Sequence, residues 1–130
     1  MIDTEYNENS EPELICKLTD FGFSCVLDQG ESLHQRLGTP LYMAPEMVEN
    51  QAYDSKVDTW ALGVLAYVLL SGGRYPFADK ELSIILRKVC NEAPNFAFVS
   101  EYDDPLLISD FLNCCLQKDP NLRYSSEQLL

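Results

Sequence analysis

The sequence predicts a mainly α fold with a short β element at its N-terminal end. Residues 59–70 are almost wholly apolar and follow Asp58, a residue type that favours the N-cap of a helix. Residues 79–90 place apolar side chains at helical spacing, and residues 14–18 form a short apolar run that is typical of a strand. The 130 residues, of which 46% are hydrophobic and 23% charged, suit one globular domain.

The N-terminal part of the chain is expected to hold the β element and a long loop. Residues 1–2 are interpreted as the end of a strand that pairs with residues 14–18, and residues 3–13 as an acidic, Asn-rich loop. The second strand leads into a turn at residues 20–22. Residues 23–37 are mixed in character and predict a surface loop.

Helices separated by turns account for the rest of the chain. Pro45 favours the first turn of a short helix over residues 44–50. The helix over residues 59–70 is apolar on all sides, which predicts a central helix that is buried all round, and Gly72 follows to end it. Its expected core side chains are Trp60, Leu62, Leu65 and Val68.

Further helices are predicted beyond a turn with an aromatic anchor at residues 74–77. They cover residues 79–90 and 106–117, and a turn at residues 118–121 follows. A last helix is expected to begin at Ser125, which matches a capping box together with Gln128.

The net charge of −12 limits the kinds of partner that the chain can have. A strongly acidic chain is repelled by nucleic acid and by anionic membrane surfaces, and it suits a partner or substrate rich in Lys and Arg. Ordinary solubility is the alternative explanation of the same charge. No apolar run is long enough to span a bilayer, so we expect no membrane span.

The cysteines indicate a reducing intracellular environment, such as the cytoplasm. The chain has five of them, an odd number, and no Cys-x-x-Cys motif, so neither a disulfide framework nor a zinc site is predicted. We expect buried free thiols, with Cys25 the most exposed of them.

The most informative motifs are Asp-Phe-Gly at residues 20–22 and Ala-Pro-Glu at residues 44–46, with Gly-Thr-Pro-Leu-Tyr-Met between them at residues 38–43. Together with residues 53–64 and 119–124, and in the same order, they resemble segments of eukaryotic Ser/Thr protein kinases. These segments are most similar to the calcium- and calmodulin-dependent branch of that family. The resemblance implies that nearly the whole chain has the fold of the C-terminal, large kinase lobe.

The resemblance also implies roles for individual residues. Asp20 would bind Mg²⁺ on the phosphates of ATP, Phe21 would pack under the small lobe, and Gly22 would let the backbone turn sharply. Thr39 points to protein substrates that are phosphorylated on Ser or Thr, and the acidic charge suits basic residues in those substrates. The expected platform for the substrate peptide consists of Gly38, Thr39, Pro40, Leu41 and Tyr42.

Four other residues receive structural roles from the resemblance. Glu46 and Arg123 would form a buried ion pair that ties the activation segment to the helical base. Asp58 would accept hydrogen bonds from the backbone of the catalytic loop, in addition to capping its helix. Trp60 would lie in the core.

Several parts of an active kinase have no match in the 130 residues: the Gly-rich loop, the strand lysine, its helix glutamate, the catalytic Asp and the second metal-binding Asn. We therefore expect a partial kinase domain, which lacks the small lobe and the catalytic loop. Its parts are residues 1–13 (strand remnant and acidic loop), 14–46 (strand and activation segment) and 47–130 (helical lobe).

The parent enzyme would transfer the γ-phosphate of ATP to protein Ser or Thr with Mg²⁺. The chain alone is expected to be inactive and to bind neither cofactor tightly, because one carboxylate holds Mg²⁺ only together with substrate phosphates. The alternative is a genuine short, non-catalytic module that docks basic peptides or a partner kinase.

Overall fold

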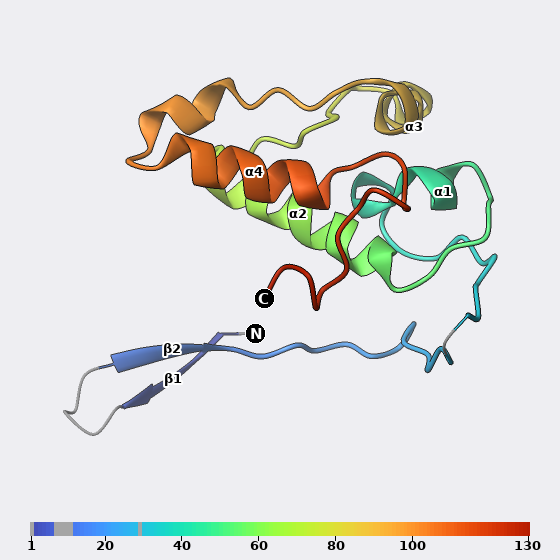
Figure 1. Ribbon diagram of the computed structural model, residues 1–130, viewed down its shortest axis with the longest axis horizontal. Helices are drawn as coiled ribbons and strands as arrows, with labels where there is room; N and C mark the ends of the chain where they lie inside the picture. The colour runs from blue at the N-terminus through green and yellow to red at the C-terminus, as the bar shows by residue number, and fades with distance from the viewer. Residues whose placement is uncertain (1, 7–11, 29) are drawn as a thin grey trace.

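The computed structural model describes residues 2–6, 12–28 and 30–130. Figure 1 shows a hairpin of two strands and a group of helices. In chain order the elements are β1 (Ile2–Tyr6), β2 (Pro12–Cys16), the 3₁₀ helix η1 (Pro40–Tyr42), α1 (Pro45–Val48), α2 (Lys56–Leu70), α3 (Leu82–Asn91), the 3₁₀ helix η2 (Ala97–Glu101) and α4 (Pro105–Cys115).

The hairpin provides the partner that was predicted for the strand before the Asp-Phe-Gly turn. β1 and β2 are antiparallel, with Ile2 opposite Cys16. β2 ends at Cys16, earlier than predicted, and residues 3–6 form a strand where a loop was predicted. In β1 the strand-favouring residues Ile2, Thr4 and Tyr6 alternate with two acidic residues, and this spacing outweighs the acidic composition. Outside the described residues lie residue 1 and residues 7–11 of the predicted loop.

The α2 helix begins earlier than predicted. Its first residue is Lys56, so Asp58, predicted as the N-cap, lies inside the first turn instead. The start is earlier because Asp54 Oδ1 accepts a hydrogen bond from the Lys56 N–H at 2.9 Å, which shapes the turn ahead of Asp58. A carboxylate in the first turn still favours the helix through the helix dipole.

One face of α2 is buried and the other is not. Trp60 and Tyr67 lie in the core, and α4 packs along the same helix (Figure 1). Leu62 and Leu65, predicted as core residues, are exposed instead, while Val68 is half-buried against the core. The prediction of burial on every side is therefore wrong for the described residues, because none of them covers the second face. An apolar sequence indicates burial only where a partner element exists.

Aromatic side chains fill the centre of the core. The Trp60 ring stacks on Phe77 with 5.8 Å between ring centroids and an angle of 8° between planes. Tyr67 meets Phe98 edge-on at 4.9 Å. The indole N–H of Trp60 has no hydrogen-bond partner among the described residues, so contacts of the ring itself hold this side chain.

The later elements agree with the predicted helices, apart from their ends. α3 buries Ile85 and Val89 as its pattern predicts, and α4 ends at Cys115, earlier than predicted. The capping box is present: the Ser125 N–H donates to Gln128 Oε1 at 2.8 Å, and the Gln128 N–H donates to Ser125 Oγ at 3.4 Å. These residues form a turn, however, and not the predicted helix.

The cysteines differ in burial more than the sequence predicts. Cys115 is buried, and Cys25 is exposed as predicted. Cys16 is also exposed, which contradicts the expectation of a buried thiol, because it belongs to the hairpin and not to the core of the helices. In the described part of the chain, no helix is both long and apolar enough to cross a membrane.

The backbones of α2 and α4 approach closely at Gly63. A Cβ atom placed on Gly63 would lie 2.5 Å from Cys115 Cβ and 3.0 Å from Leu116 Cδ2. Protein interiors are close-packed, and such a short distance between carbon atoms requires the two helices to separate. Glycine at this position therefore sets the spacing between the two helices.

We expect Gly63→Ala to destabilise the fold. In an exposed helix the same change stabilises by about 0.5–1 kcal/mol, because glycine loses more backbone entropy on folding. At Gly63 the contact with Cys115 outweighs this gain, since overpacking costs about 1–3 kcal/mol. Urea unfolding measures the net change. The control Ser83→Ala, at an exposed position of α3, should be neutral or stabilising. A more stable Gly63→Ala variant would contradict the close contact.

Candidate functional site

The predicted peptide platform, Gly38 to Tyr42, is a tight turn directly before α1. Gly38 has a φ of 102°, a left-handed conformation that favours glycine, and Pro40 begins η1 with its fixed φ. The Tyr42 N–H donates to the Thr39 carbonyl at 3.0 Å and closes the turn. Leu41 and Tyr42 are half-buried against the core, whereas Thr39 is exposed. Leu41 and Tyr42 thus hold the turn against the core, and Thr39 points outward from it.

Tyr75, predicted only as part of a turn, supports the platform. Its ring meets the Tyr42 ring edge-on, with 5.9 Å between centroids and 85° between planes. The neighbouring Tyr75 side chain, and after it burial, raises the pKa of the Tyr42 hydroxyl. No local pattern relates the two positions, so only the folded chain shows that they belong together.

A cavity of about 200 Å³ lies beside the platform. Asp58 and Ala61 of α2 form part of its wall, and the loss of water there raises the pKa of the Asp58 carboxyl. Among the described residues, none donates a hydrogen bond to the Asp58 carboxylate, so its role toward a catalytic loop stays a prediction. The other lining residues are Leu37, Gly38, Thr39, Tyr42, Met43, Met47 and Val57.

Asp20, the predicted metal ligand, lies in an exposed turn after β2. Its φ of 64° is left-handed, which is uncommon outside glycine. The Ser24 N–H donates to the Phe21 carbonyl at 3.1 Å and closes the turn. A Cβ atom on Gly22 would lie 3.3 Å from Asp20 Oδ1, so glycine leaves room for the carboxylate. Phe21 is exposed, and so are all residues from 16 to 26.

The described residues do not complete a Mg²⁺ site by themselves. They contain no group of three or more His, Cys, Asp or Glu side chains that could hold a metal ion. Mg²⁺ requires octahedral oxygen coordination and takes one or two carboxylates together with waters and substrate phosphates. Asp20 can therefore supply one ligand of such an ion, but the described residues do not supply a full coordination shell.

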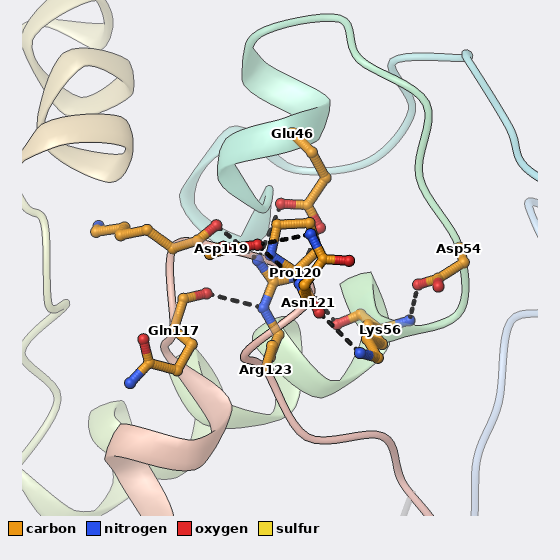
Figure 2. A network of polar contacts seen from close by, with 9 residues as sticks. Glu46, Asp54, Lys56, Gln117, Asp119, Pro120, Asn121 and Arg123 are labelled. Carbon is orange, nitrogen blue, oxygen red and sulfur yellow. Dashed lines mark hydrogen bonds and ion pairs between the residues drawn. The ribbon is translucent and has the colours of Figure 1, made fainter.

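A buried ion pair ties the platform to the end of the chain, as Figure 2 shows. Glu46, in the first turn of α1, accepts from Arg123 Nη1 at 2.5 Å and from Nη2 at 2.9 Å. The side chains are 3% and 0% exposed, respectively. The contact predicted between these residues is present, although they are 77 positions apart in the chain. Two parallel bonds between planar groups fix orientation as well as distance.

The other donors of Arg123 are also satisfied. Nε donates to the Gln117 carbonyl at 3.0 Å, Nη1 to the Lys56 carbonyl at 3.2 Å and Nη2 to the Lys118 carbonyl at 3.4 Å. The guanidinium carbon lies 5.1 Å from the centroid of the Trp60 ring. Each N–H of the guanidinium thus has an acceptor, so its burial leaves no polar group unpaired.

The turn after α4 is held in place from both sides (Figure 2). Asp119 Oδ1 accepts from the Asn121 N–H at 2.9 Å and from its side-chain amide at 3.0 Å. The Arg123 N–H donates to the Asp119 carbonyl at 3.1 Å. Lys56 Nζ, at the start of α2, donates to the Pro120 carbonyl at 2.8 Å. These bonds hold the backbone of the turn in the position from which the Arg123 side chain contacts Glu46.

Lys118 links the same turn to α3. Its Nζ donates to the carbonyls of Lys88 and Val89 in the last turn of that helix. The ammonium also lies 3.8 Å from the ring centroid of Phe77 and 4.9 Å from that of Trp60. Burial, which disfavours the charged form, lowers the pKa of Lys118 to about 8. The lysine thus fastens α3 to the aromatic core.

Comparison with known proteins gives independent information about this chain. A family model described as the protein kinase domain matches residues 1–130. Similar proteins include the liver/testis phosphorylase b kinase gamma catalytic chain of Rattus norvegicus, 37% identical over 120 residues. A probable myosin light chain kinase of Dictyostelium discoideum is 34% identical over 128 residues, and the serine/threonine-protein kinase dst3 of the same organism is 32% identical over 120 residues.

These matches cover most of the chain but only part of each relative. They include 88%, 94% and 92% of the chain, respectively, and 29%, 35% and 21% of the relatives. The chain therefore spans about a third or less of the length of the curated relatives that it matches.

We expect Glu46→Ala and Arg123→Ala each to destabilise the fold by about 3–5 kcal/mol, because either change leaves a buried charge unpaired. The double variant should cost much less than the sum, since it removes both charges. Chemical denaturation of the four proteins measures this cycle.

The matched control for that cycle is the exposed pair Arg87–Glu92. Its N···O distance is 3.6 Å and its side chains are 65% and 49% exposed. A coupling of at most about 1 kcal/mol is expected there. Additive losses at Glu46 and Arg123 would show that the buried contact does not couple them.

We expect folding stability to rise between pH 8 and pH 9 through Lys118. Below about pH 8 the amine is protonated in both states. Above it the folded protein loses this proton, whereas the unfolded lysine, with a pKa of 10.5, keeps it. The unfolded state then binds more protons, so the free energy of unfolding increases with pH. Above pH 9 Cys115 opposes the rise, because burial raises its pKa from 9.0 to about 11.

Urea unfolding at pH 8 and at pH 9 measures this effect. The Lys118→Met variant keeps the length of the side chain but has no titrating group. Its free energy of unfolding should therefore not increase between pH 8 and pH 9. The same pH dependence in both proteins would exclude Lys118 as the cause.

Proposed function

The chain belongs to the protein kinase family, and we propose that it forms the substrate-binding part of an enzyme that phosphorylates Ser and Thr in proteins. Protein kinases use ATP and Mg²⁺ and act on protein substrates. The fold is mostly helical, with a short β element before the Asp-Phe-Gly motif. We propose the division predicted above: residues 1–13, residues 14–46 with the activation segment, and residues 47–130 as the helical lobe.

The observation that carries this proposal is the contact between Glu46 and Arg123. Glu46 lies in the first turn of α1, and the platform ends directly before that helix. The two hydrogen bonds of the pair therefore fix the platform on the helical core. Phosphoryl transfer depends mainly on positioning and charge stabilisation, so a rigid platform is useful to such an enzyme.

In this proposal the substrate peptide lies along Gly38, Thr39, Pro40, Leu41 and Tyr42. The exposed side chain of Thr39 is available to the reacting site, and the contact between Tyr42 and Tyr75 keeps the platform from shifting. The net charge of −12 supports substrates with Lys or Arg near the phosphorylated residue.

We further propose that Asp20 supplies one oxygen ligand to Mg²⁺ in the complete enzyme, and that Phe21 and Gly22 form the turn that holds it. Asp58 would accept hydrogen bonds from a catalytic loop.

The 130 residues alone would transfer no phosphate and bind ATP and Mg²⁺ only weakly, because they contain no catalytic base and no glycine-rich nucleotide loop. The five free cysteines suit a reducing compartment such as the cytoplasm.

The proposal can be tested with a chimaera, in which these 130 residues replace the matching segment of the rat phosphorylase b kinase gamma catalytic chain. We expect the chimaera to phosphorylate a basic peptide that contains Ser. The Asp20→Ala chimaera should lose nearly all activity, because Mg²⁺ loses a ligand. The 130 residues alone should give no signal above a blank.

The matched control is Asp28→Ala, which removes another exposed carboxylate from the same loop and should leave activity unchanged. A folded chimaera without activity would contradict the proposed function. Full activity of the Asp20→Ala chimaera would exclude the metal role, and turnover by the 130 residues alone would exclude their inactivity.

A further inference from the structure

Two leucines at the start of α4 face solvent, although the helix has an apolar side that packs in the core. Leu106 is 81% exposed and Leu107 is 65% exposed, whereas Leu112 is fully buried. Pro105 begins the helix, and Asp104 Oδ1 accepts a hydrogen bond from the Leu107 N–H at 3.1 Å. The two leucines therefore project from a capped helix end with a defined backbone.

Carboxylates lie beside these two leucines. Asp110 is at position i+4 relative to Leu106 and at i+3 relative to Leu107. Residues at these spacings lie on the same side of a helix, so Asp110 is next to both leucines in α4. Asp103 precedes the helix and is exposed, as is Asp110. Neither carboxylate forms an ion pair with another described residue. Residues 89–117 contain no Lys, Arg or His at all, so the surrounding sequence offers no internal cation.

A third exposed leucine lies at the same end of the helix pair. Leu69 is near the C-terminal end of α2, and the two helices run in opposite directions (Figure 1). The Tyr102 hydroxyl, just before α4, donates to the Leu70 carbonyl at 2.6 Å and joins the two ends. Exposed leucines of both helices therefore lie at the same end of the helix pair as Asp103.

We propose that Leu106 and Leu107, with Asp103 and Asp110, form a docking surface for a basic amphipathic segment of a partner protein. Such a segment would place apolar side chains against the leucines and Lys or Arg against the carboxylates. The surface is separate from the peptide platform, and it does not depend on the proposed phosphoryl transfer.

Charge decides between this partner and other possible occupants. A second copy of the chain would bring the same carboxylates together, and like charges oppose such a contact. A membrane with anionic lipids would meet a chain of net charge −12 and be repelled. A segment with Lys and Arg removes the repulsion and supplies the missing cations.

The proposal can be tested with a synthetic helical peptide that carries Leu on one face and Lys on the other. The chain is tethered at low density, so that copies do not meet, and biolayer interferometry measures the affinity. We expect binding that weakens as salt is raised, and no binding of a peptide with Glu in place of Lys. The variant with Leu106→Ser and Leu107→Ser should bind roughly tenfold more weakly or worse.

Two further variants separate the surface from general charge attraction. Asp103→Asn with Asp110→Asn should lower the affinity and reduce its salt dependence. Leu122→Ser, which alters a leucine with the same 65% exposure elsewhere on the chain, should bind as the unaltered protein does. Thermal unfolding of each variant confirms that it is folded.

Three results would overturn the proposal. The first is an equal loss of binding in Leu122→Ser and in the double leucine variant, or no loss in either. The second is a dimer in sedimentation experiments that the double leucine variant abolishes, which would make a second copy the occupant. The third is binding to anionic vesicles that depends on the same two leucines.

Discussion

The contact between Glu46 and Arg123 is the interaction on which the arrangement of this domain depends. The guanidinium reaches α1 through Glu46, the start of α2 through the Lys56 carbonyl and the end of α4 through the Gln117 carbonyl. Segments that are up to 77 positions apart in sequence thus meet on one side chain. A buried charge is costly unless all of its hydrogen bonds are made, and an apolar replacement of similar size often gives equal stability. The main contribution of the pair is therefore to fix the relative positions of these elements, and not to add net stability.

Lys118 and Arg123 together place two cations against one aromatic core. Lys118 contacts Phe77 and Trp60 from the α3 side, and Arg123 contacts Trp60 from the α1 side. Aromatic faces attract cations, which lowers the cost of burying them. The helical layer is thus not held by apolar packing alone. Its centre is an aromatic stack, and the charged side chains on that stack connect the outer helices.

The sequence was sufficient to locate α2, α3 and α4 but insufficient to show what surrounds them. Apolar spacing identified α2, α3 and α4, but it could not show that Leu62 and Leu65 would lack a covering partner. The N-cap of α2 was misplaced because Asp58 was chosen by residue type, whereas a bond to Asp54 starts the helix earlier. Helix patterns record which residues are apolar, while burial depends on what else is present.

The candidate site shows the same division. Glu46 and Arg123 were found because a family resemblance linked them, and no local rule would have paired them. Tyr75 and Lys118 were missed, since each acts through a contact with a residue far along the chain. Contacts of this kind follow from the folded backbone, so a single sequence gives no signal for them.

The position of Trp60 makes its intrinsic fluorescence a probe of the folded domain. It is the one tryptophan of the chain, and it is fully buried. Two cations lie close to its ring, Lys118 at 4.9 Å and Arg123 at 5.1 Å. Indole emission responds to nearby charge and to water. Its wavelength and intensity therefore report whether Lys118 and Arg123 are in contact with the Trp60 ring, without any added label. A local opening at this contact could be followed separately from the loss of helix that circular dichroism records.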